Sequence, residues 1–403
     1  MGDPLLVCAT NDLWKQKRKA CSHAFYKERM TMMLETLKDL CMEMVEKITD
    51  EIESSAESVS VHNVGALFEQ LFSRNIITVS FGEDITDIPI PYKVLNDDGS
   101  ITTEHISISA YISRVGYESV PVFFDSLKGS MWNKLFRKTH KIYHVTPRGQ
   151  IYEENCRTLR AFIFDYVQKR KRGEVTSKVA GQTDILSLML ANQQVFTDEV
   201  IVDEMADFFA AATETTQYTT QTIVSYLEKC PASLARIRAE FESVFETACE
   251  EEPALKGLPR REMMRRFLSV DNLNDMDFLN RVICEALRWQ APVGGSSNFL
   301  AQADIQLGKY KLLKGDGAQV MIYGLHFNST QWQRPHEFLP ERFDPKSPLF
   351  LTPAGKKRHP MSFVPFSGGS RVCFGKTFAE ANLRIVTTHL SQHFEISHQE
   401  KAR

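Results

Sequence analysis

The sequence lacks the features that would place it in a membrane, in an export pathway or on nucleic acid. None of its 403 residues lies in an apolar run approaching the roughly 18–20 residues that a membrane-spanning helix needs. No export signal opens the chain, because Asp3 and Pro4 come early and Leu5–Ala9 is too short an apolar core. The formal net charge of −3 argues against a general nucleic-acid binder. As written, the chain is therefore expected to be soluble and cytoplasmic.

Several catalytic motifs are missing as well. The eight cysteines form no Cys-x-x-Cys pair, which argues against a zinc ribbon or a redox pair. No Gly-x-Ser-x-Gly string marks a hydrolase. His336-Glu337 would suit a zinc protease, but Pro340 stands in place of the second histidine. The Gly375-Lys376-Thr377 string resembles the end of a P-loop, yet Ser370 occupies the position of the required first glycine.

What the sequence does contain is mostly helical pattern. The longest candidate helix is Thr197–Lys229, where Thr197 can cap the first turn and Pro231 ends the last. At 1.5 Å per residue it would be roughly 50 Å long, enough to cross a domain. Its threonine-rich middle suggests a local bend, because threonine hydroxyls can bond back to the preceding turn. Apolar residues at three- and four-residue intervals predict further helices over 11–25, 30–48, 64–81, 151–172, 275–290 and 376–394.

Strand-like sequence is confined mainly to Phe299–Tyr323, with a turn at Lys314–Gly317. The prolines and the Asp97-Asp98-Gly99 signal within Ile85–His105 indicate a loop or a small hairpin. The sequence therefore predicts one mainly helical domain with a small β-sheet.

The first string that carries chemistry is Phe366-Ser-Gly-Gly-Ser-Arg371-Val-Cys373-Phe-Gly375. A lone cysteine where a loop enters a helix faces the positive helix end, which favours the thiolate. The glycines allow close backbone approach, and Arg371 supplies a positive charge for an anionic group. A buried structural cysteine is the alternative for a single cysteine, but the whole string favours a ligand.

Three further strings are weak alone and informative together. Glu285 and Arg288 are three residues apart on one helical face, and Arg342 could complete a buried network with them. Glu214 beside Thr215, after Ala211 and Ala212, could pass protons on a loosened helix. Trp14 and Arg18, four residues apart, can reach one anionic group, while Lys15, Lys17 and Lys19 would point elsewhere.

In this order and spacing the four strings resemble the cytochrome P450 family, over about Leu6 to Phe394. The resemblance implies a haem b between the long central helix and the helix after the cysteine loop. It implies that Cys373 is the axial thiolate and the metal ligand. It further implies haem contacts from Trp14, Arg18, Ala211, Phe366, Arg371 and Gly375, a proton relay through Glu214 and Thr215, and a structural network of Glu285, Arg288 and Arg342. His326 and Trp332 also fall at family-like positions.

The sequence departs from the family pattern in three places. Ala212 stands where a glycine is usual, and Asn298 where many members carry a propionate-binding arginine. Trp14 lies so early that the usual N-terminal anchor, first helices and first strands of the family are expected to be absent from residues 1–403. The strands near Phe299–Ala301 and Gln319–Ile322 are then expected to lack partners and to expose their edges.

The leading hypothesis is a haem-thiolate monooxygenase that inserts one oxygen atom from O2 into a hydrophobic small molecule. Its electrons would come from NADPH through a flavoprotein reductase docking on the cysteine-side face, near Lys15, Lys17 and Lys19. No nucleic-acid partner is expected. A full-length form would sit on the cytosolic face of the endoplasmic reticulum membrane. The alternatives are a haem-thiolate hydroperoxide isomerase or dehydratase, and a truncated fragment that binds haem weakly or is inactive.

Overall fold

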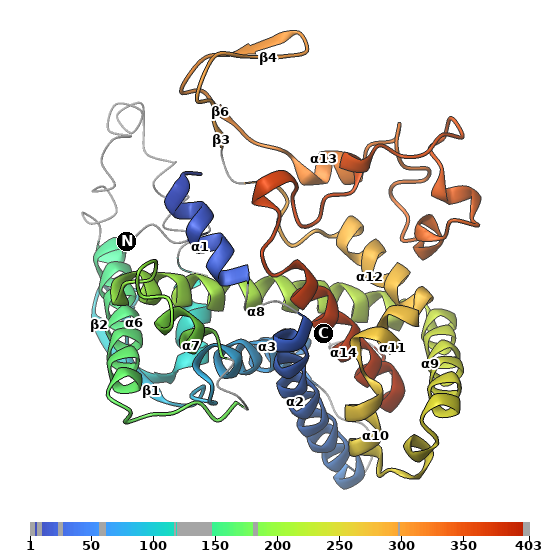
Figure 1. Cartoon of the computed structure of the whole chain (residues 1–403), viewed down its shortest axis with the longest axis horizontal. Coiled ribbons are helices and arrows are strands. Elements are labelled where there is room, and N and C mark those ends of the chain that lie inside the picture. The colour runs from blue at the N-terminus through green and yellow to red at the C-terminus, as the bar shows by residue number, and fades with distance from the viewer. Residues whose placement is uncertain are drawn as a thin grey trace. The chain divides into compact units, whose positions relative to one another are not determined.

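The protein folds into two compact units, seen here in a computed structural model that describes residues 5, 10–22, 27–55, 62–116, 118, 147–179, 184–296 and 299–397. The first unit comprises Met1–Leu40 with Glu69–Glu214, and the second comprises Cys41–Phe68 with Thr215–Arg403. Three helices, labelled α2, α3 and α8 in Figure 1, contribute residues to both units. Asn298 lies outside the described residues.

The first unit is built mainly from helices around one β-hairpin. The long helix α8 shows an unbroken helical pattern, and the hydroxyl of Thr197 accepts a hydrogen bond from the N–H of Val200 at 3.4 Å, as its predicted capping role requires. The elements that supply residues to this unit are α1 (Asp12–Ser22), α2 (Lys27–Ser54), α3 (Val64–Phe81), β1 (Pro89–Leu95), β2 (Ile101–Ser107), α6 (Pro147–Lys171), α7 (Ile185–Leu190) and α8 (Asp198–Lys229).

The hairpin settles the ambiguity left by the sequence between 85 and 105. Strands β1 and β2 pair antiparallel from Pro89↔Ser107 to Leu95↔Ile101. Gly99 takes a φ of +82° at the turn, a conformation that glycine adopts without steric cost. Asn155 on α6 fixes the hairpin, because its side chain bonds both the N–H and the C=O of Lys93 at 2.9 Å. The Asn155 side chain therefore joins α6 to β1 by the same pair of hydrogen bonds that a neighbouring strand would make.

The second unit has a core of three helices, α9, α12 and α14, which pack on one another. Arg238 on α9 donates to the carbonyls of Ser391 and Phe394, and so caps the C-terminal end of α14. The elements that follow α8 are α9 (Pro231–Glu251), α10 (Arg260–Phe267), α11 (Val270–Asp275), α12 (Asp277–Trp289), β3 (Phe299–Leu300), β4 (Ile305–Leu307), β5 (Tyr310–Leu312), β6 (Gly317–Ala318), α13 (Ile322–His326) and α14 (Lys376–His393).

Pro231 has two roles at the junction of α8 and α9. It follows the last residues of α8 and is also the first helical residue of α9, a position where its missing N–H costs nothing. From the sequence, Pro231 was predicted only to end α8, and α9 was not predicted. The buried face of α9 is carried by Leu234, Ile237 and Phe241.

The strands of the second unit are short and poorly covered. Strand β3 pairs with β6, and β4 pairs with β5, each as a two-stranded antiparallel ladder. The expectation that the strand near Phe299 lacks a partner was therefore wrong, because β6 pairs with it. Within the described part of the chain, however, neither ladder has a third strand. We call the segments 293–296 and 299–323 the β-ribbon; its exposed apolar side chains include Leu300 at 62% and Met321 at 59%.

The mainly helical architecture with small antiparallel sheets matches the predicted fold class. Predicted and observed bounds coincide for α3 and nearly so for α8 and α14. Among the described residues, no helix combines the length and the apolar character needed to cross a bilayer. The cysteines of the described segments are all free thiols.

Candidate functional site

The loop before α14 presents Cys373 to solvent. The loop contains a short 3-10 turn at Gly369–Arg371 and reaches α14 at Gly375, the residue that caps the helix. The N–H of Cys373 donates to the carbonyl of Phe366 at 2.8 Å, which closes the loop on itself. Ser367 and Gly369 both have positive φ, so the tight path depends on left-handed conformations there. The sulfur therefore lies two residues ahead of the cap of an 18-residue helix, near its positive end.

Glu285, Arg288 and Arg342 form one network in the second unit, and each side chain is fully buried. Arg288 binds Glu285 with both ends of its guanidinium, at 2.7 Å to each carboxylate oxygen. Arg342 adds a third contact at 3.1 Å. The N–H of Leu339 donates to the same carboxylate at 2.8 Å. A bidentate pair with every oxygen satisfied is the geometry in which a buried ion pair is tolerated.

The remaining guanidinium hydrogens of this network bind backbone carbonyls. Arg288 donates to the carbonyls of His326, Pro335 and Glu337 at 2.9–3.2 Å. Arg342 donates to those of Gln333, Arg334 and Glu337. The two arginines thereby tie the loop between α13 and the 3-10 turn Pro340–Phe343 to α12. The path of this loop is therefore fixed by hydrogen bonds from two arginine side chains to main-chain carbonyl oxygens.

His326 and Trp332 occupy the core around this network, and neither is exposed. The Nε2 of His326 accepts from the N–H of Val364 at 3.0 Å, while Nδ1 lies 3.3 Å from the carbonyl of Arg288. Burial lowers the pKa of His326 to about 4, so the ring is neutral at physiological pH. The guanidinium of Arg358 stacks 4.3 Å from the ring centre of Trp332. His326 thus links α12 to the segment that leads into the cysteine loop.

The middle of helix α8 alternates between buried and partly exposed side chains. Ala211 is exposed and Asp207 and Thr215 are partly so, whereas Met205, Phe209 and Thr213 are buried. The hydroxyls of Thr219, Thr220 and Thr222 donate to the carbonyls four residues earlier at 2.9–3.0 Å. This is the back-bonding expected of the threonine-rich stretch, and α8 nevertheless remains one helix.

The carboxyl group of Glu214 lies next to the backbone of a glycine, Gly116, in the first unit. A Cβ added to Gly116 would come within 2.4 Å of Oε1 of Glu214. Glycine at 116 therefore leaves room for the carboxyl group. Burial and the neighbouring Glu69 raise the pKa of Glu214, which brings it toward the range where a carboxyl group can exchange protons near neutrality.

On α1, Trp14 and Arg18 lie together, with the Arg18 guanidinium 5.6 Å from the indole ring centre. The expectation for Lys17 was wrong. It is buried in an ion pair with Glu204 at 3.1 Å, and so it cannot form part of an exposed basic face. The local spacing could not reveal this contact, because Glu204 is remote in sequence. Lys15 and Lys19 are exposed, and Lys15 pairs with Asp12.

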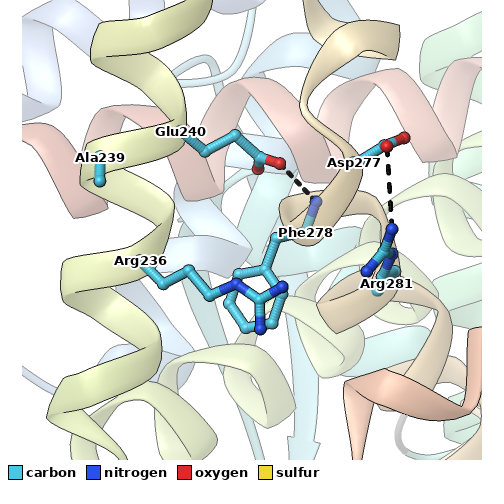
Figure 2. Close-up of a pocket in the computed structure, with 6 residues that line it drawn as sticks. All are labelled: Arg236, Ala239, Glu240, Asp277, Phe278 and Arg281. Atoms are coloured by element: carbon cyan, nitrogen blue, oxygen red, sulfur yellow. Dashed lines mark hydrogen bonds and ion pairs between the residues drawn. The ribbon is translucent and has the colours of Figure 1, made fainter. Parts of the chain in front are cut away.

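A surface cavity of about 410 Å³ lies between α9 and the start of α12 (Figure 2). Glu240 points at the first turn of α12 and accepts the N–H groups of Phe278 and Leu279 at 2.6 and 3.0 Å. Arg236 stacks on the Phe278 ring at 3.8 Å. The helix N-terminus already has its anionic partner in Glu240, so the contacts lining this cavity join α9 to the helix that carries Glu285.

The side chains of the cysteine loop and of α1 have the chemistry that a haem requires. The cysteine loop offers one exposed sulfur and one arginine, Arg371. A Cβ on Gly369 or Gly375 would meet no described heavy atom within 4 Å, which leaves open space beside the sulfur. In the first unit, Trp14 and Arg18 form the kind of cation and ring pair that binds a carboxylate edge. Thiolate, open face and guanidinium groups are what a haem with two propionates requires.

Comparison with known proteins decides the family. The family model described as "Cytochrome P450" matches residues 4–403. The chain belongs to the cytochrome P450 family. Rat cytochrome P450 4A10 is 23% identical over 97% of this chain and 69% of its own length. Human cytochrome P450 4F3 is 29% identical over 61% of this chain and 45% of its own length. For the human P450 4F relatives, the chain spans about half of the relative's length.

A solved P450 structure gives the same fold. The retinoic acid bound cyanobacterial CYP120A1 superposes with a TM-score of 0.70 at 18% identity, over 97% of this chain and 73% of that one. At this identity the likeness shows the P450 fold alone.

Sequence reasoning missed Asp207, Gly116 and Arg358. A signal existed for Asp207, which shares a helix face with Ala211 at the i, i+4 spacing. Gly116 and Arg358 gave none, because their partners are distant in the chain.

Proposed function

We propose that this P450 chain is the catalytic core of a haem-thiolate monooxygenase in which Cys373 binds the iron. The observation that carries the proposal is the exposed sulfur of Cys373 in a closed loop two residues ahead of the cap of α14. Bound haem would supply the activation of O2, with the thiolate pushing electron density to favour O–O cleavage. The helix dipole and nearby N–H groups hold the sulfur in its anionic form.

The arginines and the tryptophan anchor the cofactor in this proposal. Arg18 and Arg371 each offer a planar fork of donors that suits a propionate carboxylate. Trp14 packs beside Arg18 and holds its guanidinium in place. Phe366 closes the cysteine loop through its carbonyl, and Gly375 permits the turn into α14.

Helix α8 contributes space and protons. Ala211 keeps its part of the helix face open, because its methyl group is the smallest side chain after glycine. The raised pKa of Glu214 makes its carboxyl group easier to protonate than an ordinary one, and the hydroxyl of Thr215, the next residue, can both accept and donate. Together they deliver protons toward the oxygen-binding face of the helix.

The substrate is a hydrophobic small molecule. One P450 relative, 28% identical over 64% of this chain, is named an ultra-long-chain fatty acid omega-hydroxylase, and the solved neighbour binds retinoic acid. Both ligands are largely apolar, which supports an apolar substrate class here. Electrons come from NADPH through a flavoprotein reductase on the cysteine-side face, and a longer form associates with the endoplasmic reticulum membrane.

The test is the absorption spectrum of the reduced, carbon-monoxide-treated protein reconstituted with haem. Wild type should show the red-shifted Soret band of thiolate ligation, and Cys373→Ser should lose it. Cys230→Ser is the matched control, because Cys230 is a partly exposed thiol of the same unit and lies at a helix start, the cap of α9. It should retain the thiolate band.

A histidine-type spectrum in wild type, or a thiolate band that survives in Cys373→Ser, contradicts the proposal. Haem that binds only loosely in every variant supports the inactive-fragment alternative instead.

A further inference from the structure

A buried ion pair joins α1 to α8 in the first unit. The Nζ of Lys17 lies 3.1 Å from Oε1 of Glu204, and only 3% and 0% of the two side chains are exposed. The same carboxylate accepts the N–H of Leu5 at 2.9–3.0 Å. Glu204 therefore fastens both Leu5 and α1 to one point of α8.

The acids next to Glu204 on α8 have different surroundings. Asp203 pairs with Arg160 of α6. Asp207 has a buried Oδ2 atom with no hydrogen-bond partner among the described residues. In the described part of the chain, Glu204 is thus the acid of this stretch whose ion pair reaches α1.

Lys17 lies in the middle of the buried face of α1. Trp14, Lys17 and Cys21 follow one another at three- and four-residue intervals, and each is at most 5% exposed. Burial, and then the nearby Glu204, raise the pKa of the Cys21 thiol, which places Glu204 against this same face. The face that α1 turns inward is therefore centred on a charged group.

The ion pair can fix a property of α1 that its apolar contacts leave loose. Apolar burial is non-directional, so a helix that rotates slightly about its own axis loses little of it. A buried ion pair is tolerated only where its partners meet. Burial raises the pKa of Glu204, whereas the Leu5 N–H and the charge of Lys17 lower it. The carboxylate and the ammonium group therefore depend on one rotation of α1.

That rotation also sets the direction of the two haem-binding side chains of α1. Trp14 precedes Lys17 by almost one turn, and Arg18 follows it directly. The Arg18 guanidinium lies 5.6 Å from the indole ring centre, so the two side chains move together with the helix. The proposed function assigns both to a propionate, and in that respect the inference rests on it.

We propose that Glu204 is a positioning residue for the haem, which acts through Lys17 to fix the rotation of α1 and so to aim Trp14 and Arg18 at a propionate. Glu204 itself touches no part of the cofactor. Its loss together with Lys17 should weaken haem binding more than folding, because uncharged side chains can often replace a buried ion pair without loss of stability.

The experiment removes the pair without leaving a buried charge. Lys17→Met with Glu204→Gln keeps the net charge and the approximate volume, and glutamine retains an acceptor for the Leu5 N–H. The rate of haem transfer from the ferric protein to an excess of apomyoglobin measures how tightly haem is held. Transfer should be at least about tenfold faster than in wild type, the size of one misdirected charge-assisted hydrogen bond. The melting temperature of the haem-free chain should stay near that of wild type.

The neighbouring pair of α8 is the matched control. Arg160→Met with Asp203→Asn likewise removes one charge of each sign from a pair that joins α8 to another helix, with 34% and 10% of the side chains exposed. This variant should transfer haem at the wild-type rate. Equal acceleration in both double variants would mean that any ion pair of α8 has this effect, and it would overturn the proposal.

Hydrogen exchange of the haem-free chain provides a readout that needs no cofactor. Amides of α1 should exchange faster in Lys17→Met with Glu204→Gln than in wild type, because the helix opens locally more often, while those of α7 should be unchanged. Wild-type rates of haem transfer, or wild-type exchange in α1, overturn the positioning role. A double variant that no longer melts cooperatively assigns the pair to folding and overturns it too.

Failure of the proposed function has a different signature. The thiolate band is then absent in wild type or survives in Cys373→Ser, whereas exchange in α1 still reports whether Glu204 holds that helix.

Discussion

Two regions of the second unit differ in how completely their polar groups are paired and their side chains are covered. Around Glu285 the side chains of both arginines and the carboxylate are buried, and each has several hydrogen-bond partners within the second unit. In the β-ribbon the strands are two or three residues long, and Leu300 and Met321 remain largely exposed. The network is complete within its unit, whereas the β-ribbon shows only one partner per strand in the described chain.

The comparison shows that the two kinds of structure need different numbers of residues to satisfy their hydrogen bonds. An arginine fork reaches carboxylate and carbonyl oxygens from neighbouring turns, so a few residues suffice. A sheet needs a whole neighbouring strand to satisfy each edge and to cover each face. The network should therefore be sensitive to single changes, and the β-ribbon should tolerate them.

The largest expected effect comes from breaking the network. Arg288→Met removes the bidentate partner of Glu285 and leaves a buried charge with one guanidinium contact. The free energy of unfolding should fall by about 3–5 kcal/mol, the usual cost of orphaning a buried ion. Chemical denaturation of the purified protein measures this loss.

Arg334→Ala provides the comparison. Arg334 pairs with Glu337 at the surface of the same segment, with 56% and 48% of the side chains exposed. Its loss should lower the free energy of unfolding far less than the loss of Arg288 does, because the pair is screened by solvent. Equal costs for the two variants would show that the buried network contributes nothing special.

The next effect is a pH dependence at His326. Its folded pKa of about 4 lies below the unfolded value of about 6.5, so folding disfavours the protonated ring. The stabilising contribution is complete above pH 6.5 and is lost as the pH falls toward 4. Between these values stability should decrease by roughly 2–3 kcal/mol from this residue.

His326→Gln isolates that contribution, since glutamine can keep a hydrogen bond but does not titrate. The variant should be less stable near pH 7 and should show a shallower loss of stability between pH 6.5 and 4. Parallel curves for variant and wild type would assign the acid sensitivity to other groups.

The smallest effect on stability, and a large one on solubility, is expected in the β-ribbon. Leu300→Lys with Met321→Lys should change the free energy of unfolding by less than about 0.5 kcal/mol, because both side chains are exposed. Charge on the strand edges should reduce self-association, as measured by light scattering at several protein concentrations. Ile101→Lys, at an exposed position of the longer β1–β2 hairpin, should leave scattering unchanged. A cost above about 2 kcal/mol for the double variant would mean that this surface is packed.

The sequence predicted the long helices well, because their apolar periodicity and end signals are local. Thr197 and Pro231 marked α8 correctly, and the 64–81 periodicity gave α3 its observed bounds. The pairing of Glu285 with Arg288 also followed from local spacing. The addition of Arg342 to this pair was proposed from the order of the strings along the chain, and the contacts are present.

What could not be predicted depends on contacts between distant residues. Lys17 looked like one of three exposed lysines, but Glu204 draws it into the interior. Helix α9 was overlooked because Pro231 was interpreted only as a terminator. The unsatisfied oxygen of Asp207 emerges only when the partners of its neighbours are known. The location of a haem between α8 and α14, and the treatment of residues 1–403 as a single domain, stay predictions.

The arginines of the network recognise peptide carbonyls, and every amino acid supplies a carbonyl. Substitutions along 333–337 can therefore accumulate without altering the path of the chain, provided that they leave Glu285, Arg288 and Arg342 in place. The side chains that this stretch presents to solvent can therefore change, in evolution or by design, while three side chains preserve its backbone path.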